Sequence, residues 1–70
     1  MELTTEEKRA IVEQHMKNIA YSDYNLYISL LEAEASEDKN QSTIDSINQQ
    51  ILNNTAQKAA LQAELDSLTA

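Results

Sequence analysis

The chain has 70 residues with five basic and twelve acidic side chains, a net charge of -7, and no Gly, Pro or Cys. The lack of Cys excludes disulfides and thiolate sites, and the scattered Lys and Arg do not form the clustered basic surface that nucleic acid requires. A core of this size is marginal without a staple, so oligomerisation is the stabilising device that remains.

The composition predicts an all-α fold. Neither Gly nor Pro interrupts a helix, Phe and Trp are absent, and Ala, Leu, Ile, Gln and Glu are common. Residues 1–20 contain no uninterrupted apolar run. We therefore expect no secretion signal, no membrane span and a soluble, cytoplasmic protein.

The first helix is expected over about residues 5–36. Thr4 and Glu7 have the spacing of a capping box, in which each side chain accepts a hydrogen bond from the other residue's backbone amide. Beyond this cap, mainly apolar residues recur at alternating spacings of four and three, the heptad pattern of a helix that packs along one neighbour. These positions, the first seam, are Val12, Met16, Ile19, Asp23, Leu26, Leu30 and Ala33.

A turn is expected over about residues 37–41, because residues 36–43 contain no apolar side chain. Ser42 and Asp45 have N-cap spacing, which predicts a second helix over about residues 42–69. The heptad pattern resumes there in a second seam that contains two polar members. The second seam is Ile44, Ile47, Ile51, Asn54, Lys58, Leu61, Leu65 and Leu68.

The two seams match each other if the chain folds into an antiparallel hairpin in which facing residue numbers add to 77. Asp23 then lies opposite Asn54, with Lys58 one turn away. We hypothesise that this intramolecular polar layer fixes the pairing of the helices, since other registers would set Asp23 against Leu or Ile. The alternative is that Asp23 reaches solvent and specifies nothing.

The sequence therefore predicts one helical-hairpin domain over residues 1–70, a two-helix coiled coil that assembles into an oligomeric helix bundle. One continuous helix in a parallel coiled coil is the competing architecture, because the heptad phase does not change across the polar gap.

Each predicted helix carries a further apolar stripe on a face rotated from its seam. The tyrosine stripe is Tyr21, Tyr24, Ile28, Leu31 and Ala35, and the alanine stripe is Leu52, Ala56, Ala59 and Ala63. A helix with two apolar faces needs two neighbours, and small Ala side chains leave room for Tyr rings. We expect the stripes to form a homo-oligomer interface, most simply a dimer of hairpins in a four-helix bundle.

No residue pattern predicts catalysis, a cofactor or a metal site. His15 is the one His, and Val12 stands where a metal-binding Glu-x-x-His motif requires Glu. A calcium loop beginning at Asp38 lacks its Gly and its terminal Glu, since Thr43 and Gln49 occupy those positions.

Two functions remain open, and neither is enzymatic. The first is a small structural or adaptor protein that self-associates through its helix faces. The second is an acidic regulatory module that occupies a basic or helical surface of an unidentified protein partner. The acidic residues near the turn, Glu32, Glu34, Glu37 and Asp38, are expected to form a solvated rim that weakly attracts divalent cations, and the structural or adaptor protein could present this turn to a larger complex.

Overall fold

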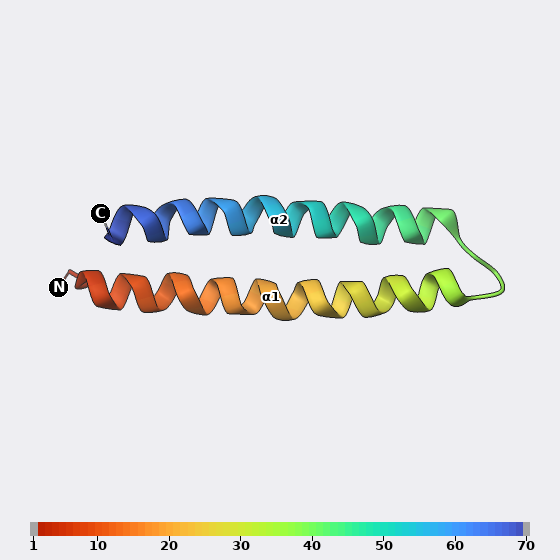
Figure 1. Ribbon diagram of the computed structural model, residues 1–70, viewed down its shortest axis with the longest axis horizontal. Helices are drawn as coiled ribbons and strands as arrows, with labels where there is room; N and C mark the ends of the chain where they lie inside the picture. Colours follow the sequence, from red (N-terminus) through yellow and green to blue (C-terminus); the bar gives the residue numbers. More distant parts are fainter. Residues whose placement is uncertain (1, 70) are drawn as a thin grey trace.

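The computed structural model describes residues 2–69 as two helices that run side by side in opposite directions (Figure 1). Helix α1 spans Thr5–Ala35 and helix α2 spans Gln41–Thr69, with 31 and 29 residues. The hairpin measures 54 × 19 × 15 Å. The predicted all-α class and the packing of two helices against each other are confirmed, and the alternative of one continuous helix is wrong.

Helix α1 begins at the predicted capping box. The Thr4 hydroxyl accepts a hydrogen bond from the Glu7 amide at 3.1 Å, and a Glu7 carboxylate oxygen accepts one from the Thr4 amide at 3.0 Å. These bonds satisfy two amides that would otherwise have no partner at the helix start. They also place the Glu7 and Glu6 carboxylates in the first turn, where the helix dipole favours negative charge.

Helix α2 begins one residue earlier than its expected start, because its N-cap is Asn40 and not Ser42. The Asn40 side-chain oxygen accepts hydrogen bonds from the amides of Ser42 at 3.0 Å and Thr43 at 3.3 Å. Asn is among the strongest N-cap residues, since its short side chain reaches the amides two and three positions ahead. The spacing of Ser42 and Asp45 was therefore misinterpreted: in the structure Asp45 accepts from the Gln41 side chain instead.

The chain reverses over residues 36–40 without a glycine. Ser36, the C-cap of α1, is extended, and no residue of the described part of the chain has a positive φ. The last turn of α1 contains no basic side chain, so nothing there compensates the negative end of the helix dipole. Polar residues that end one helix and cap the next are sufficient for the reversal.

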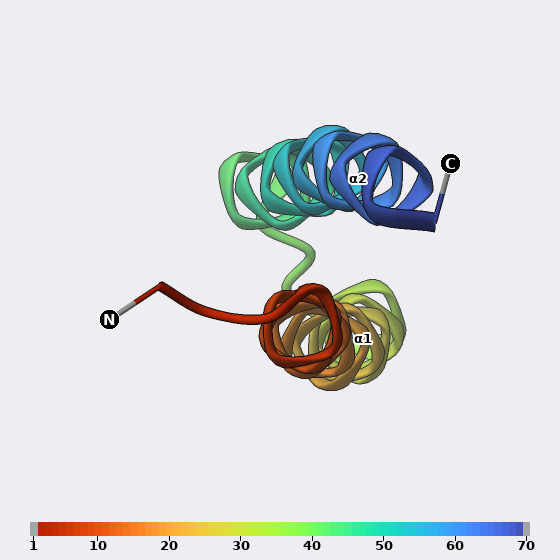
Figure 2. The same cartoon turned by 90° about the vertical axis from the view of Figure 1, so that its left-hand side faces the viewer.

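The exposure of the side chains follows the two seams. Among residues 2–69, those that are not exposed are Arg9 and all members of the two seams except Lys58. Val12 and Ile47 are the most buried, at 9% and 7% exposure. Figure 2 shows the hairpin along its helices, where each helix has one neighbouring helix. Most seam residues therefore stay partly exposed to water.

Arg9 extends the first seam by one heptad position, seven residues before Met16. Arg9 is half-buried, and its Nε atom is buried and has no hydrogen-bond partner in the described part of the chain. The aliphatic stem of an Arg covers apolar surface while its head group extends toward solvent. The sequence pattern did not identify this position, because a charged residue at the end of an apolar seam resembles a surface residue.

Replacing Thr4 with Ala removes the hydroxyl acceptor of the capping box. We expect the free energy of unfolding to fall by about 1 kcal/mol, the usual cost of losing such a cap. Chemical denaturation followed by circular dichroism measures the change at one fixed protein concentration. Thr5→Ala is the matched control, because Thr5 is inside the helix and its removal should change stability far less.

The capping box also predicts a pH dependence. The hydrogen bond from the Thr4 backbone amide, and then the one with its side chain, lower the pKa of the Glu7 carboxyl below its ordinary value. This contribution to stability is thus present above the unfolded-state pKa and is lost as the pH falls through the lower, folded-state value. Carbon-detected NMR titration should show Glu7 titrating at lower pH in the folded chain than in the urea-unfolded chain; equal pKa values in the two states would contradict the prediction.

Candidate functional site

The middle of the interface between α1 and α2 contains a cluster of polar side chains. The Asn54 side-chain amide donates hydrogen bonds to an Asp23 carboxylate oxygen at 2.9 Å and to the Ser22 hydroxyl at 3.1 Å. The Lys58 ammonium lies 3.6 Å from the other Asp23 oxygen. The structure thus brings together the three residues of the predicted polar layer and adds Ser22, which sequence analysis missed because it stands beside the seam.

The contacts of the layer differ in strength. Asp23 keeps 26% and Lys58 48% of its side chain exposed, so water screens this ion pair and it contributes about 0–1 kcal/mol. The bond from Asn54 to a charged carboxylate is the stronger contact, in the range of about 1.5–3 kcal/mol before allowance for partial exposure. Asn54 is therefore the residue that holds Asp23 at the interface.

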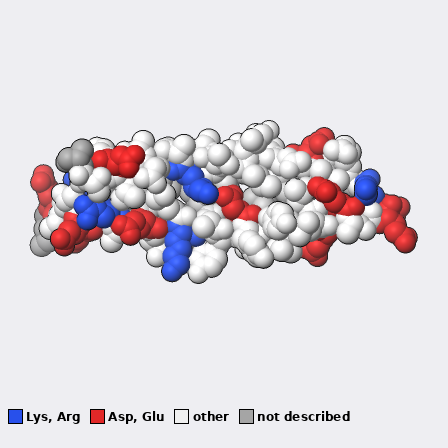
Figure 3. All heavy atoms as spheres, viewed as in Figure 1, with Lys and Arg blue, Asp and Glu red and all other residues white. Residues whose placement is uncertain are grey.

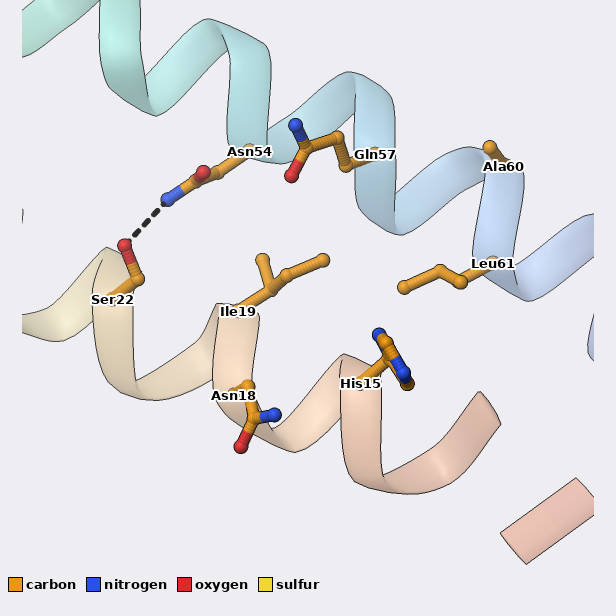
Figure 4. Close-up of a pocket in the computed structure, with 8 residues that line it drawn as sticks. All are labelled: His15, Asn18, Ile19, Ser22, Asn54, Gln57, Ala60 and Leu61. Carbon is orange, nitrogen blue, oxygen red and sulfur yellow. Dashed lines mark hydrogen bonds between the residues drawn. The ribbon is translucent and has the colours of Figure 1, made fainter. Parts of the chain in front are cut away.

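A shallow hollow of about 470 Å³ adjoins the layer. Figure 4 shows Ile19 of α1 and Leu61 of α2 pointing into it from opposite sides, with His15 beside Leu61. The remaining lining residues are Asn18, Ser22, Asn54, Gln57 and Ala60. His15 is the one acidic or basic side chain among these lining residues, so the lining pairs no general acid with a base.

The tyrosine and alanine stripes lie outside the interface between the two helices. Tyr21 is 62% exposed, Tyr24 65% and Leu52 62%. The other members of both stripes, Ile28, Leu31, Ala35, Ala56, Ala59 and Ala63, are also exposed. A single hairpin therefore leaves both predicted stripes uncovered.

Tyr27 lies beside the tyrosine stripe on α1 and makes the exposed surface there wider. It is 50% exposed, and its ring lies 6.1 Å from that of Tyr24, at an angle of 46°. This spacing is within the range of favourable aromatic pairs. Tyr27 was not assigned to the stripe because Ile28 already occupies the position between Tyr24 and Leu31, although Tyr27 is also three residues after Tyr24 and four before Leu31.

The charges are unevenly distributed along the hairpin. Residues 23–54, the half that contains the turn, carry six acidic side chains and one basic one, whereas the remaining residues carry six acidic and four basic side chains. Figure 3 shows acidic groups around one basic side chain at the turn end, and both signs mixed at the opposite end. The turn half has a net charge of -5 and the open half -2, which together give the -7 of the chain.

Comparisons with protein-family models, curated proteins and solved structures found no match to this chain. Within residues 2–69, neither helix combines the length and the apolar character of a membrane span. In the same residues, no three His, Cys, Asp or Glu side chains converge as they would around a metal ion.

Replacing Asn54 with Leu tests the polar layer. We expect unfolding free energy to fall by about 1–3 kcal/mol, because the Asp23 carboxylate loses its best donor and faces an apolar group. The double variant Asp23→Leu with Asn54→Leu should be more stable than the two single effects added together predict. Urea unfolding at one protein concentration measures the free energy of unfolding of the wild type, the two single variants and the double variant.

Ser22→Ala is the control for this cycle, because it removes only the second acceptor of the Asn54 amide. Its effect should be small. Strict additivity of the Asp23 and Asn54 variants would show that the contact between them contributes nothing to stability.

Proposed function

We propose that this chain is a small non-enzymatic structural or adaptor protein that works as a homo-oligomer, with a dimer of coiled-coil hairpins as its simplest form. The observation that carries this proposal is the exposure of the tyrosine stripe. Its four large residues, Tyr21, Tyr24, Ile28 and Leu31, lie with Tyr27 on one helix, and each of these five residues keeps between 37% and 65% of its surface exposed. Isolated exposed apolar residues are ordinary, but a contiguous group of this kind is typical of an interaction surface.

The size of the surface supports self-association. A Tyr side chain buries about 150–250 Å² when fully covered, so the three half-exposed rings with Ile28 and Leu31 offer about 500 Å² per copy. Two copies together would bury about 1,000 Å², which is the lower bound for a specific protein interface. Within residues 2–69, Val12 and Ile47 are the only buried core residues, so the hairpin would gain stability from a neighbour that covers this surface.

The polar layer supports the proposal in a different way. An exposed apolar stripe is useful only if it is presented at a fixed position, and sliding of α1 along α2 would move it. We assign to Asp23, Asn54 and Lys58 the role of fixing the register of the hairpin, because each other register separates Asp23 from its hydrogen-bond donor. The layer then serves specificity more than stability.

An acidic regulatory module is the second candidate function, and the charge distribution favours it. The half of the hairpin around the turn has one Lys against six acidic residues. Asp23 contacts Lys58 of the open half, and the other acidic residues gather toward the turn end, away from the basic side chains of the open end. A basic partner would bind this end with an affinity that falls as salt is added. Capture of a partner that is lost on charge-neutralising substitution of Glu34 and Asp38 would favour this function.

Tyr24→Glu tests self-association directly. The wild-type chain should sediment at equilibrium at twice its monomer mass of 7.9 kDa or more at micromolar concentration. The variant should sediment as a monomer, because a carboxylate in the stripe must be desolvated in the interface. Gln50→Glu is the matched control, with the same charge change at an exposed position of α2 outside both stripes, and it should keep the wild-type mass.

A wild-type chain that is folded and monomeric at these concentrations would contradict the proposed function.

A further inference from the structure

The positions of the tyrosine and alanine stripes along the length of the hairpin restrict how a second copy can bind. Because Asp23 faces Asn54, the alanine stripe over residues 52–63 lies beside residues 14–25 of α1. The tyrosine stripe occupies residues 21–35, nearer the turn. The centres of the two stripes are therefore offset by roughly 13 Å along the hairpin, at 1.5 Å per residue.

This offset disfavours the simplest contact between the two stripes. In a two-fold dimer in which α1 of one copy packs on α2 of the other, the symmetry axis runs along the hairpins and both turns lie at the same end. The tyrosine stripe would then face residues 42–56 of the second copy, where Asp45, Asn48 and Gln49 replace most of the alanine stripe. The two acidic turn ends would also lie together.

The tyrosine stripe is complementary to itself when a second α1 runs in the opposite direction. Its four large members are spaced three, four and three residues apart, a pattern that reads the same from both ends. If facing numbers add to 52, Tyr21 meets Leu31 of the second copy and Tyr24 meets Ile28 of the second copy. Each aromatic ring then packs on an aliphatic side chain. Because the axis is two-fold, each of these contacts occurs twice in the dimer.

The charges favour the same pairing. Lys17 continues the stripe one step toward the N-terminus, and in this register it faces Ala35 of the second copy, next to Glu34. Neither Lys17 nor Glu34 forms an ion pair within the described part of the hairpin, so both are available. The antiparallel arrangement also sets each turn half, of charge -5, beside an open half of charge -2, which lowers the repulsion between two acidic chains.

We infer that the second copy packs α1 against α1 in antiparallel orientation, with the two-fold axis at the level of Leu26. This inference rests on the proposed self-association and replaces a tyrosine–alanine contact with a tyrosine–aliphatic one. The interface consists of two equivalent Tyr21–Leu31 contacts, two Tyr24–Ile28 contacts and an ion pair of Lys17 with Glu34 at each end. The alanine stripe stays outside this contact.

Single-cysteine cross-linking tests the arrangement, and the chain has no native Cys to interfere. Asn25 and Asn18 are exposed and seven residues apart, so they lie along the same edge of the tyrosine stripe. In the inferred dimer, the two Asn25 positions are offset by about 3 Å along the helix axis and the two Asn18 positions by about 24 Å. A short bismaleimide should therefore link Asn25→Cys into covalent dimers and leave Asn18→Cys unlinked.

The outcomes separate the inference from the proposed function. Equal linking of both variants would show parallel α1 helices, and linking of neither would show that α1 does not pack on α1. Each result overturns the inferred arrangement, while a dimer mass in sedimentation would still support self-association. A monomer mass would overturn both.

Charge exchange gives a second readout that needs no cysteine. Lys17→Glu sets two carboxylates together at each end of the interface, so the dissociation constant of the dimer should rise several-fold. Adding Glu34→Lys to the same chain restores opposite charges and should return the constant to near the wild-type value. Failure of the second substitution to compensate would contradict the predicted pairing of these residues.

Discussion

The hydrogen bond from Asn54 to Asp23 is the constraint on which the rest of the hairpin depends. At 2.9 Å it joins the midpoints of two helices whose other facing side chains are almost all apolar and interchangeable. Leu and Ile tolerate a shift of one helix along the other, whereas a carboxylate set against them loses its donors. In the role that we propose for it, this one polar contact determines which residues of α1 and α2 face each other, and with them the positions of both exposed stripes along the hairpin.

The architecture also explains why the hairpin presents so much apolar surface. Two helices of 31 and 29 residues can cover only one face of each other. Even the most buried residues of the described part of the chain, Val12 and Ile47, keep 9% and 7% of their surface exposed. A chain without disulfides has no internal means of adding to this core. The same geometry that makes the hairpin marginal leaves the tyrosine stripe exposed, so the proposed assembly would cover the surface that a single hairpin cannot cover.

The sequence predicted the parts of the fold that depend on periodicity and failed where local geometry decides. The seams were predictable, because heptad spacing states directly which side chains lie between two helices. The start of α1 was predictable from Thr4 and Glu7, but two polar residues could cap α2, and the spacing of Ser42 and Asp45 favoured the wrong one over Asn40. Ser22 and Tyr27 were missed because their contacts depend on side-chain direction, which a pattern of apolar positions does not contain.

Isotope-filtered NMR of a mixture of labelled and unlabelled chains tests the central claim most directly. The Asn54 side-chain amide protons should show nuclear Overhauser effects to the β-protons of Ser22 and Asp23 within the same chain, because these side chains are in hydrogen-bond contact in the hairpin. Effects between Asn54 of one chain and Asp23 of another, with none inside a chain, would show that the helices pair between copies, and would contradict the hairpin on which the account rests.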